Sequence, residues 1–105
     1  MKQVSMFTEN GFSGERFTRL LVQDSPYFKI INFNFTAGQE LPVHSHNLEG
    51  QVALTILEGE GLYLDGKSEP LPVKAGDVLI SEIAEPHGLR ATSDLRLLVV
   101  IAPPI

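Results

Sequence analysis

No stretch of ten or more residues in this chain repeats its hydrophobic side chains with the 3.6-residue period of an α-helix. Short runs rich in β-branched and aromatic residues follow one another instead, separated by turns that contain Gly or Pro. Residues 31–35 alternate cleanly, so that Ile31, Phe33 and Phe35 share one face of a strand and two asparagines share the other. Short strands at close, regular spacing predict an all-β sandwich or barrel.

The 105 residues are enough for one domain and too few for a second hydrophobic core. Residues 1–15 show no sustained periodicity and are expected to form an irregular arm, which could include a short strand and could pack on another subunit. A loop at residues 83–86 is expected to deliver His87 into the segment 88–91. The predicted strands cover residues 16–23, 27–35, 40–46, 51–57, 62–64, 69–73, 78–81 and 95–101.

Charge and composition exclude several classes of function. The net charge of −5 argues against a nucleic-acid backbone or an anionic membrane as partner, because both attract basic surfaces. The absence of cysteine excludes disulfides, zinc–thiolate clusters and cysteine nucleophiles. No run resembles a signal peptide or approaches the roughly 18 apolar residues of a membrane span, so a cytoplasmic protein is expected.

The three histidines of the chain suggest a metal site. His44 and His46 form a His-x-His pair, and side chains two apart on a strand project from the same face, roughly 7 Å apart. Two such imidazoles can grip one transition metal. We hypothesise that folding brings His87 beside them to complete a three-histidine site. The alternatives are ordinary surface histidines, or a pair that titrates near its usual pKa of about 6.5.

The arrangement of these residues resembles that of the cupin superfamily. The first cupin motif begins with Gly, five residues and His-x-His, as Gly38, His44 and His46 do here, and it closes on a turn such as Gly59. The second motif is matched by Gly76, Pro86 and His87 at the expected separation. The resemblance covers residues 31–101 and implies a small double-stranded β-helix, a cupin-type β-barrel or jelly roll.

The chain departs from the cupin pattern where the family places a glutamate ligand. Counting forward from His46 puts Gln51 in that position, whereas counting back from Gly59 puts Val52 there. Gln51 and Glu49 are the polar candidates, and Gln51 is favoured because it opens a strand that continues into the core. In the second motif, Glu82, Ala84 and Ala91 replace the usual Pro, Gly and Asn.

The resemblance implies a divalent transition metal (Fe, Ni, Mn, Cu, Co or Zn) held by His44, His46, His87 and Gln51. It implies a small organic molecule as partner, and a dioxygenase or an isomerase if the protein is an enzyme. A non-catalytic module that binds a sugar or another effector, with the metal structural or absent, is the alternative. A homodimer is expected both from the family and from uncovered apolar surface at the N-terminal strands and at residues 101–105.

Other side chains are weaker candidates for the same pocket. Tyr63 could donate a proton and Arg90 could clamp an anion, although a structural or surface role is the simpler reading of each. Glu82 and Glu85 could act as a general acid or base beside the metal. Three aromatic residues could line the pocket or belong to the core, and they are Phe28, Phe33 and Phe35.

Overall fold

Nine strands and one short helix make up residues 1–105 in the computed structural model. The helix is α1 (Met6–Glu9). The strands are β1 (Thr18–Asp24), β2 (Lys29–Phe35), β3 (Glu40–His44), β4 (Gln51–Glu58), β5 (Glu60–Leu64), β6 (Leu71–Lys74), β7 (Val78–Glu82), β8 (His87–Ala91) and β9 (Leu95–Ala102). The all-β fold expected from the sequence is confirmed. The structure contains no helix of the length and hydrophobicity needed to cross a lipid bilayer.

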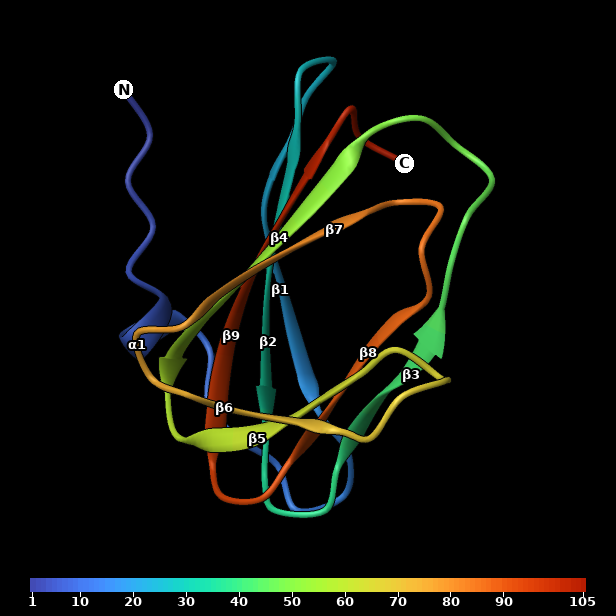
Figure 1. The fold of residues 1–105 in the computed structure, drawn as a ribbon. Coiled ribbons are helices and arrows are strands. Elements are labelled where there is room, and N and C mark those ends of the chain that lie inside the picture. The colour runs from blue at the N-terminus through green and yellow to red at the C-terminus, as the bar shows by residue number, and fades with distance from the viewer.

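The strands form two antiparallel sheets that face each other as a jelly roll (Figure 1). One sheet has the order β1-β2-β9-β4-β7 and the other has the order β3-β8-β5-β6. Strands distant in the chain therefore become neighbours: β2 and β4 flank β9, and β3 and β5 flank β8. This crossing connectivity brings the segment around residue 44 next to the segment around residue 87.

The interior is filled at one end of the barrel and hollow at the other. Phe35, Ile56 and Leu95 are completely buried at the filled end, where burial of each side chain contributes about 1.5–3 kcal/mol. At the opposite end of the same strands, Lys29 pairs with Ile101 in the register of β2 and β9. This hollow end holds the cavity described below.

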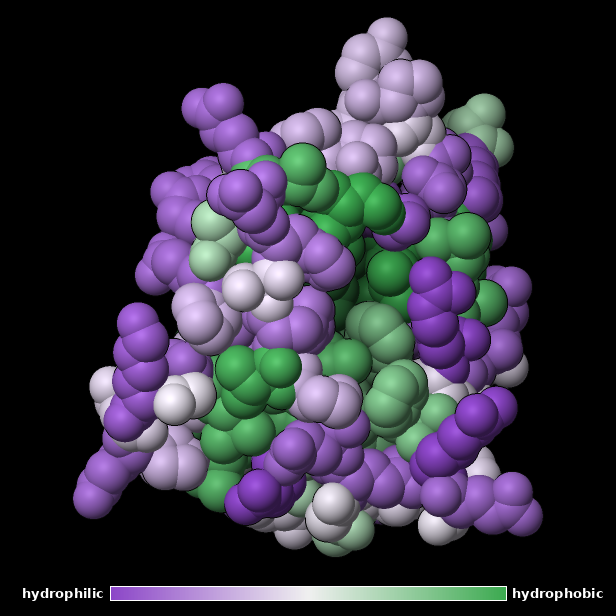
Figure 2. Space-filling model, turned by 90° about the vertical axis from the view of Figure 1, so that its right-hand side faces the viewer, coloured by the Kyte–Doolittle hydropathy of each residue, from purple (hydrophilic) through white to green (hydrophobic).

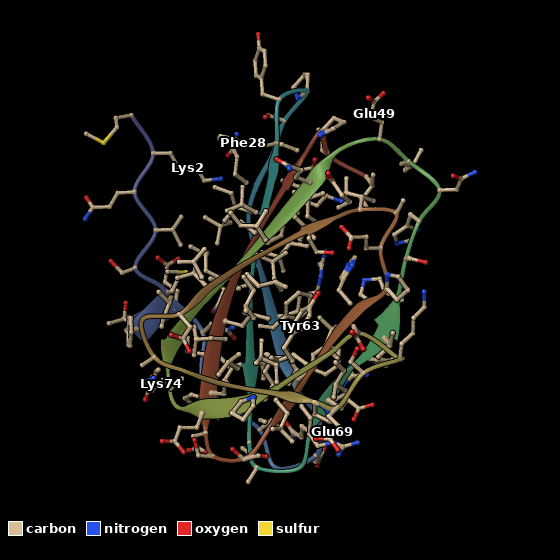
Figure 3. All side chains as sticks on the ribbon, viewed as in Figure 1. Lys2, Phe28, Glu49, Tyr63, Glu69 and Lys74 are labelled. Carbon is tan, nitrogen blue, oxygen red and sulfur yellow. The ribbon has the colours of Figure 1, made fainter.

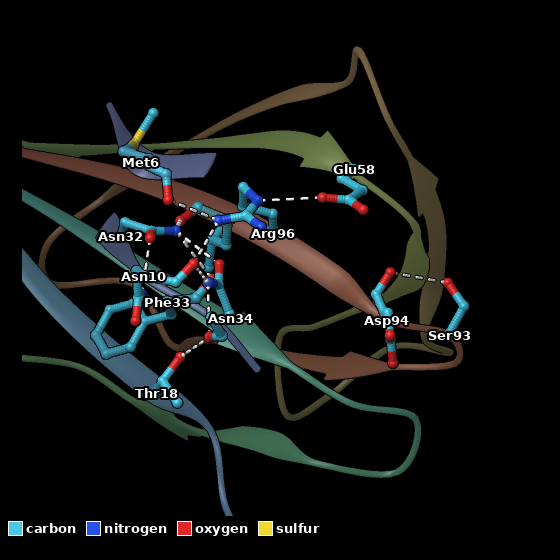
Figure 4. A network of polar contacts seen from close by, with 12 residues as sticks. Met6, Asn10, Thr18, Asn32, Phe33, Asn34, Glu58, Ser93, Asp94 and Arg96 are labelled. Atoms are coloured by element: carbon cyan, nitrogen blue, oxygen red, sulfur yellow. Dashed lines mark hydrogen bonds and ion pairs between the residues drawn. The ribbon is translucent and has the colours of Figure 1, made fainter. Parts of the chain in front are cut away.

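The N-terminal arm folds back onto its own sheet. Asn32 and Asn34 point away from the barrel interior, yet both are 0% exposed because residues 6–12 cover them (Figure 4). Asn10 donates a 2.8 Å hydrogen bond to Asn32, and Asn34 donates a 2.9 Å bond to the carbonyl of Gly11. The arm contains the helix α1 and no strand.

A buried arginine fastens this arm. Arg96 on β9 is 4% exposed and donates hydrogen bonds to the carbonyls of Met6 (2.9 Å) and Asn10 (3.0 Å). The Arg96 guanidinium also lies over the rings of Phe7 and Phe12, at 4.3 and 5.1 Å from the ring centroids. No buried side-chain nitrogen or oxygen lacks a hydrogen-bond partner, so the polar residues under the arm are fully satisfied.

Candidate functional site

A cavity of about 270 Å³ lies between the two sheets at the hollow end of the barrel. Nine of its thirteen lining residues are hydrophobic, and they come from β2, β3, β4, β9 and the segments around residues 83 and 105. The other four are His44, His46, His87 and Lys29. Figure 2, which looks onto the side of the molecule that carries β3 and β8, shows hydrophobic residues around a hollow.

A β-bulge turns His44 toward this cavity. Leu41 pairs with Leu89 and His44 pairs with His87, so three steps along β3 match two steps along β8. Without the extra residue, Leu41 and His44 would point to opposite faces of the sheet. With it, both side chains line the cavity. Pro42 lies within the bulge, where the absence of an N–H breaks no ladder hydrogen bond.

Gly88 allows β3 and β8 to approach closely beside the histidines. A Cβ at this position would meet the Leu41 carbonyl oxygen and the Val43 nitrogen at 2.8 Å each. The absence of a side chain lets the backbones lie closer than any other residue would allow. The His44 and His87 rings consequently pack edge to face, with their centroids 4.6 Å apart.

Two of the imidazoles are fixed in one tautomer by their own chain. Nδ1 of His44 lies 2.8 Å from the Pro42 carbonyl oxygen, and Nδ1 of His87 lies 2.7 Å from the Glu85 carbonyl oxygen. A carbonyl oxygen only accepts, so each Nδ1 carries the proton and donates it. In the neutral ring, Nε2 then keeps a free lone pair, which is the arrangement found in metal-ligating histidines.

His87 is held in its neutral form by its surroundings. The residue is 6% exposed, and this burial lowers the pKa of His87 below its usual value of 6.5. The hydrogen bond to Glu85 opposes the shift, and the nearby His44 and His46 rings add to it. The result is a neutral nitrogen donor at the wall of an apolar cavity.

His46 lies two residues beyond the end of β3, in the loop before β4. Its backbone N–H donates a 3.1 Å hydrogen bond to the Ile83 carbonyl, and its ring centroid lies 5.7 Å from that of His44. The ring is exposed and makes no hydrogen bond. The structure contains no group of three or more His, Cys, Asp or Glu side chains arranged to hold a metal ion. Three-histidine ligation therefore requires at least one of the imidazole rings to turn.

The structure separates Gln51 from the histidines. Val52 and Leu54 point into the barrel and line the cavity, so Gln51, one residue earlier on β4, points outward. Gln51 is exposed and pairs with Glu82 and Ala102 in the sheet. Glu49 lies in the exposed loop before β4 and points away from the barrel (Figure 3). The position that corresponds to the cupin glutamate on the inner face is therefore Val52, which has no donor atom.

The other candidate side chains also lie off the cavity. Arg90 is exposed and forms an ion pair with Glu40 at 2.9 Å. Tyr63 packs against the hydrophobic core (Figure 3). The carboxylate of Glu85 accepts a 3.1 Å hydrogen bond from the backbone N–H of Glu82.

Of the three aromatic candidates, Phe33 lines the cavity, Phe35 belongs to the core and Phe28 is exposed. Lys29 also lines the cavity, and the sequence reasoning missed it. Lys29 stands two residues before Ile31 and four before Phe33, so strand alternation puts all three on one face. This spacing could have identified it as a cavity residue.

Comparison with known proteins agrees with this architecture. The family model described as the Cupin domain matches residues 32–101, which are two thirds of the chain. The chain belongs to the cupin family. A crystal structure of an RmlC-like cupin from Desulfovibrio desulfuricans superposes with a TM-score of 0.94 and 47% identity, over 100% of this chain and 99% of the other. The double-stranded β-helix protein of Klebsiella pneumoniae gives a TM-score of 0.87 at 25% identity, over 98% and 90%.

Two named relatives also resemble this cupin in sequence. The L-ectoine synthase of Halalkalibacterium halodurans is 32% identical in an alignment that covers 93% of this chain and 78% of the synthase. The oxalate-binding protein of Thermotoga maritima is 35% identical in an alignment that covers 61% of this chain and 53% of that protein. One relative is thus named for an enzymatic activity and the other for the binding of a small acid.

Proposed function

We propose that this cupin is a metal-dependent protein for a small organic molecule, with His44, His46 and His87 as ligands of a divalent transition metal. The observation that carries the proposal is the backbone anchoring of Nδ1 in His44 and His87. This anchoring leaves one free lone pair on Nε2 of each of the two rings, beside the cavity. Both rings are held in place before any ligand binds. Gln51 is left out of the proposed ligand set because it points away from the cavity.

The donor chemistry fits a first-row transition metal rather than calcium or magnesium. Imidazole nitrogen suits Fe, Ni, Cu, Co and Zn, whereas Mg, Ca and Mn prefer oxygen donors. Three neutral imidazoles leave the charge of a divalent ion uncompensated, and such an ion polarises a bound oxygen atom as a Lewis acid. This chemistry is that of an oxygen-dependent or isomerising enzyme. The chain's own residues contribute the hydrophobic wall that excludes water and the fixed orientation of two rings.

A binding protein without catalysis is the second candidate. No side chain with a carboxylate, hydroxyl or thiol group lines the cavity, so the histidines and Lys29 are the polar side chains there. A general acid or base outside the metal set is therefore lacking apart from Lys29. The likeness to the oxalate-binding protein favours the same alternative.

Metal analysis of the protein purified without a histidine tag tests the proposal. We expect about one divalent transition metal per chain, and we expect His44→Asn and His87→Asn to weaken metal affinity by at least about 100-fold, the upper end of the loss caused by removing a group that orients a ligand. Gln51→Ala is the matched control, because its side chain lies next to the site in sequence but points outward, and it should retain the metal. A variant that carries both His44→Asn and His87→Asn and still binds the metal as tightly as the wild type would refute the proposal.

Oxygen uptake with diketones, flavonols and catechols then separates the two candidates. Turnover that depends on His44 and His87 supports the enzyme. Bound metal with no turnover on these substrates supports the binding protein.

We also infer a homodimer, formed through the outer face of β7. Strand β7 is the edge of its sheet, and its residues Val78 and Ile80 are 56% and 69% exposed. Exposed apolar edge strands invite pairing with another chain. Residues of the N-terminal arm lie on the same sheet, where Met6 accepts a hydrogen bond from Arg96.

A further inference from the structure

We propose that Ile105, held in place by Lys29, forms the wall that closes the cavity at the hollow end of the barrel and sets the longest apolar ligand that the protein admits. The inference rests on the proposed function, because the same cavity receives the ligand. It names a residue that determines specificity, and it describes the ligand as a small molecule with an apolar body of limited length.

Residues 103–105 turn back toward the cavity instead of continuing β9, which ends at Ala102. A strand continued straight would carry residue 105 about 13 Å beyond Ile101, at about 3.3 Å for each residue. Ile101 and Ile105 nevertheless line the same cavity. Figure 1 shows this turn, where the chain leaves the end of β9 and bends back at the hollow end of the barrel.

Gly50 fixes the start of this turn. A Cβ at Gly50 would lie 2.6 Å from both the carbonyl oxygen of Ala102 and Cδ of Pro103. The same Cβ would lie 2.7 Å from Cδ1 of Ile83, which lines the cavity. The turn is therefore packed closely against a part of the chain that belongs to the cavity wall, and any side chain at residue 50 would displace it.

Lys29 fastens the other end of the turn. Its side chain lies on the inner face of β2 and lines the cavity, and its ammonium group donates a hydrogen bond to the backbone oxygen of Ile105. The ammonium group has no other hydrogen bond and no ion pair with a carboxylate side chain. The stem of the lysine adds hydrocarbon to the wall while its polar head holds Ile105. Lys29 is thus a positioning residue for Ile105.

The side chain of Ile105 lies at the border between the cavity and solvent, because it lines the cavity and is still 40% exposed. A residue at this border limits how far an apolar ligand can extend. Each methylene group that a ligand buries raises its affinity about fourfold, and the gain ends where the ligand meets the wall. The volume of about 270 Å³ that remains inside is that of a small molecule.

This wall is particular to the chain rather than to the domain that it shares with other cupins. The cupin-domain model matches residues 32–101, which include the three histidines. Three of the thirteen lining residues lie outside that range, and they are Lys29, Ile31 and Ile105. The shared domain therefore supplies the imidazoles, and flanking residues supply the size limit.

Titration with straight-chain primary alcohols from butanol to nonanol, followed through the NMR signals of the isoleucine methyl groups, tests the inference. We expect the affinity of the wild type to rise about fourfold with each methylene and then to stop rising at one chain length. Ile105→Ala removes three carbon atoms from the wall and keeps the backbone oxygen that Lys29 holds. This limit should then move to alcohols that are about two to three carbons longer. Lys29→Met keeps an apolar side chain but loses the hydrogen bond, so it should raise the limit as well.

Leu48→Ala is the matched control, because it also removes three carbon atoms from a side chain that is 49% exposed, and Leu48 does not line the cavity. It should keep the limit of the wild type. An unchanged limit in Ile105→Ala, or an equal shift in Leu48→Ala, overturns the role of Ile105. A shift in Ile105→Ala without one in Lys29→Met overturns the fastening by Lys29.

The inference and the proposed function fail separately when each titration is made on the protein as purified and again after treatment with a chelator. Alcohols bind through the hydrocarbon wall, so the longer limit of Ile105→Ala should appear in both preparations. Protein that holds no metal as purified, yet shows this longer limit, overturns the metal proposal and supports the wall. Protein that holds metal and gives one limit for every variant overturns the wall and leaves the metal proposal standing.

Discussion

At the scale of single residues, Val52 occupies the inner position of β4 at which a side chain reaches the cavity. Val52→Glu places a carboxylate among the imidazoles, and a negatively charged donor strengthens the binding of a divalent cation. We expect the affinity for nickel or cobalt, measured by calorimetric titration, to rise at least about tenfold. The metal-free variant should lose about 1–3 kcal/mol of its free energy of unfolding, because an apolar site then holds a polar group.

Gln51→Glu is the control for this prediction, since it makes the same charge change one residue away on the outer face of β4. It should leave metal affinity and stability close to those of the wild type. Tighter metal binding by Gln51→Glu and not by Val52→Glu would show that the inner and outer faces have been exchanged.

The same two residues show what the sequence could and could not predict about the site. The three histidines could be found from the sequence because their spacing fits a known pattern, and the structure gathers all three around one cavity. The fourth position could not be fixed by counting, because one extra residue lies between His46 and Gly59 relative to the pattern. The alternation of hydrophobic residues in β4 could have decided between residues 51 and 52. Val52, Leu54 and Ile56 are all buried, so the inner face of the strand carries the even-numbered residues.

At the scale of elements, the close pairing of β3 and β8 depends on Gly88. Gly88→Ala puts a Cβ within 2.9 Å of three backbone atoms of Leu41 and Val43, and a strand cannot move aside as a side-chain tip can. We expect a loss of about 1–3 kcal/mol in the free energy of unfolding, measured by urea denaturation. Because β3 carries His44, metal affinity should fall as well.

Gly11→Ala is the matched substitution for Gly88→Ala, because a Cβ at residue 11 meets no atom within 4 Å and the backbone there is not left-handed. It should change stability by no more than about 0.5 kcal/mol. A Gly88→Ala variant as stable as Gly11→Ala would contradict the close approach of the two strands.

All strands except β8, which was not among the predicted strands, could be predicted from local patterns, and the arm could not. Runs of β-branched residues between Gly and Pro turns indicate strands without reference to distant partners, and each predicted run contains an observed strand or part of one. The bulge in β3 and the docking of residues 6–12 arise from contacts across the chain, such as those between Met6 and Arg96. A local pattern carries no information about such partners.

At the scale of the whole molecule, an apolar row crosses the outer face of the five-stranded sheet. Ile80 pairs with Ala53, Ala53 pairs with Val100 and Val100 pairs with Ile30, so these four side chains lie side by side on β7, β4, β9 and β2. The row ends at the unpaired edge of β7. A two-fold axis beside this edge would place the β7 strands of two copies next to each other, which buries Val78 and Ile80 of both.

Ile80→Lys tests this arrangement, because a charge at the β7 end of the row opposes its burial and lysine on an edge strand blocks pairing. We expect sedimentation velocity at micromolar concentration to give twice the mass of one chain for the wild type and the mass of one chain for Ile80→Lys. Leu21→Lys makes the same change on β1, the opposite edge of the sheet, where Leu21 is also exposed, and it should remain a dimer. A monomeric wild type, or a dimer that Leu21→Lys dissociates and Ile80→Lys does not, would exclude β7 as the interface. Because residue 80 lies outside the cavity, metal binding should be the same in both variants.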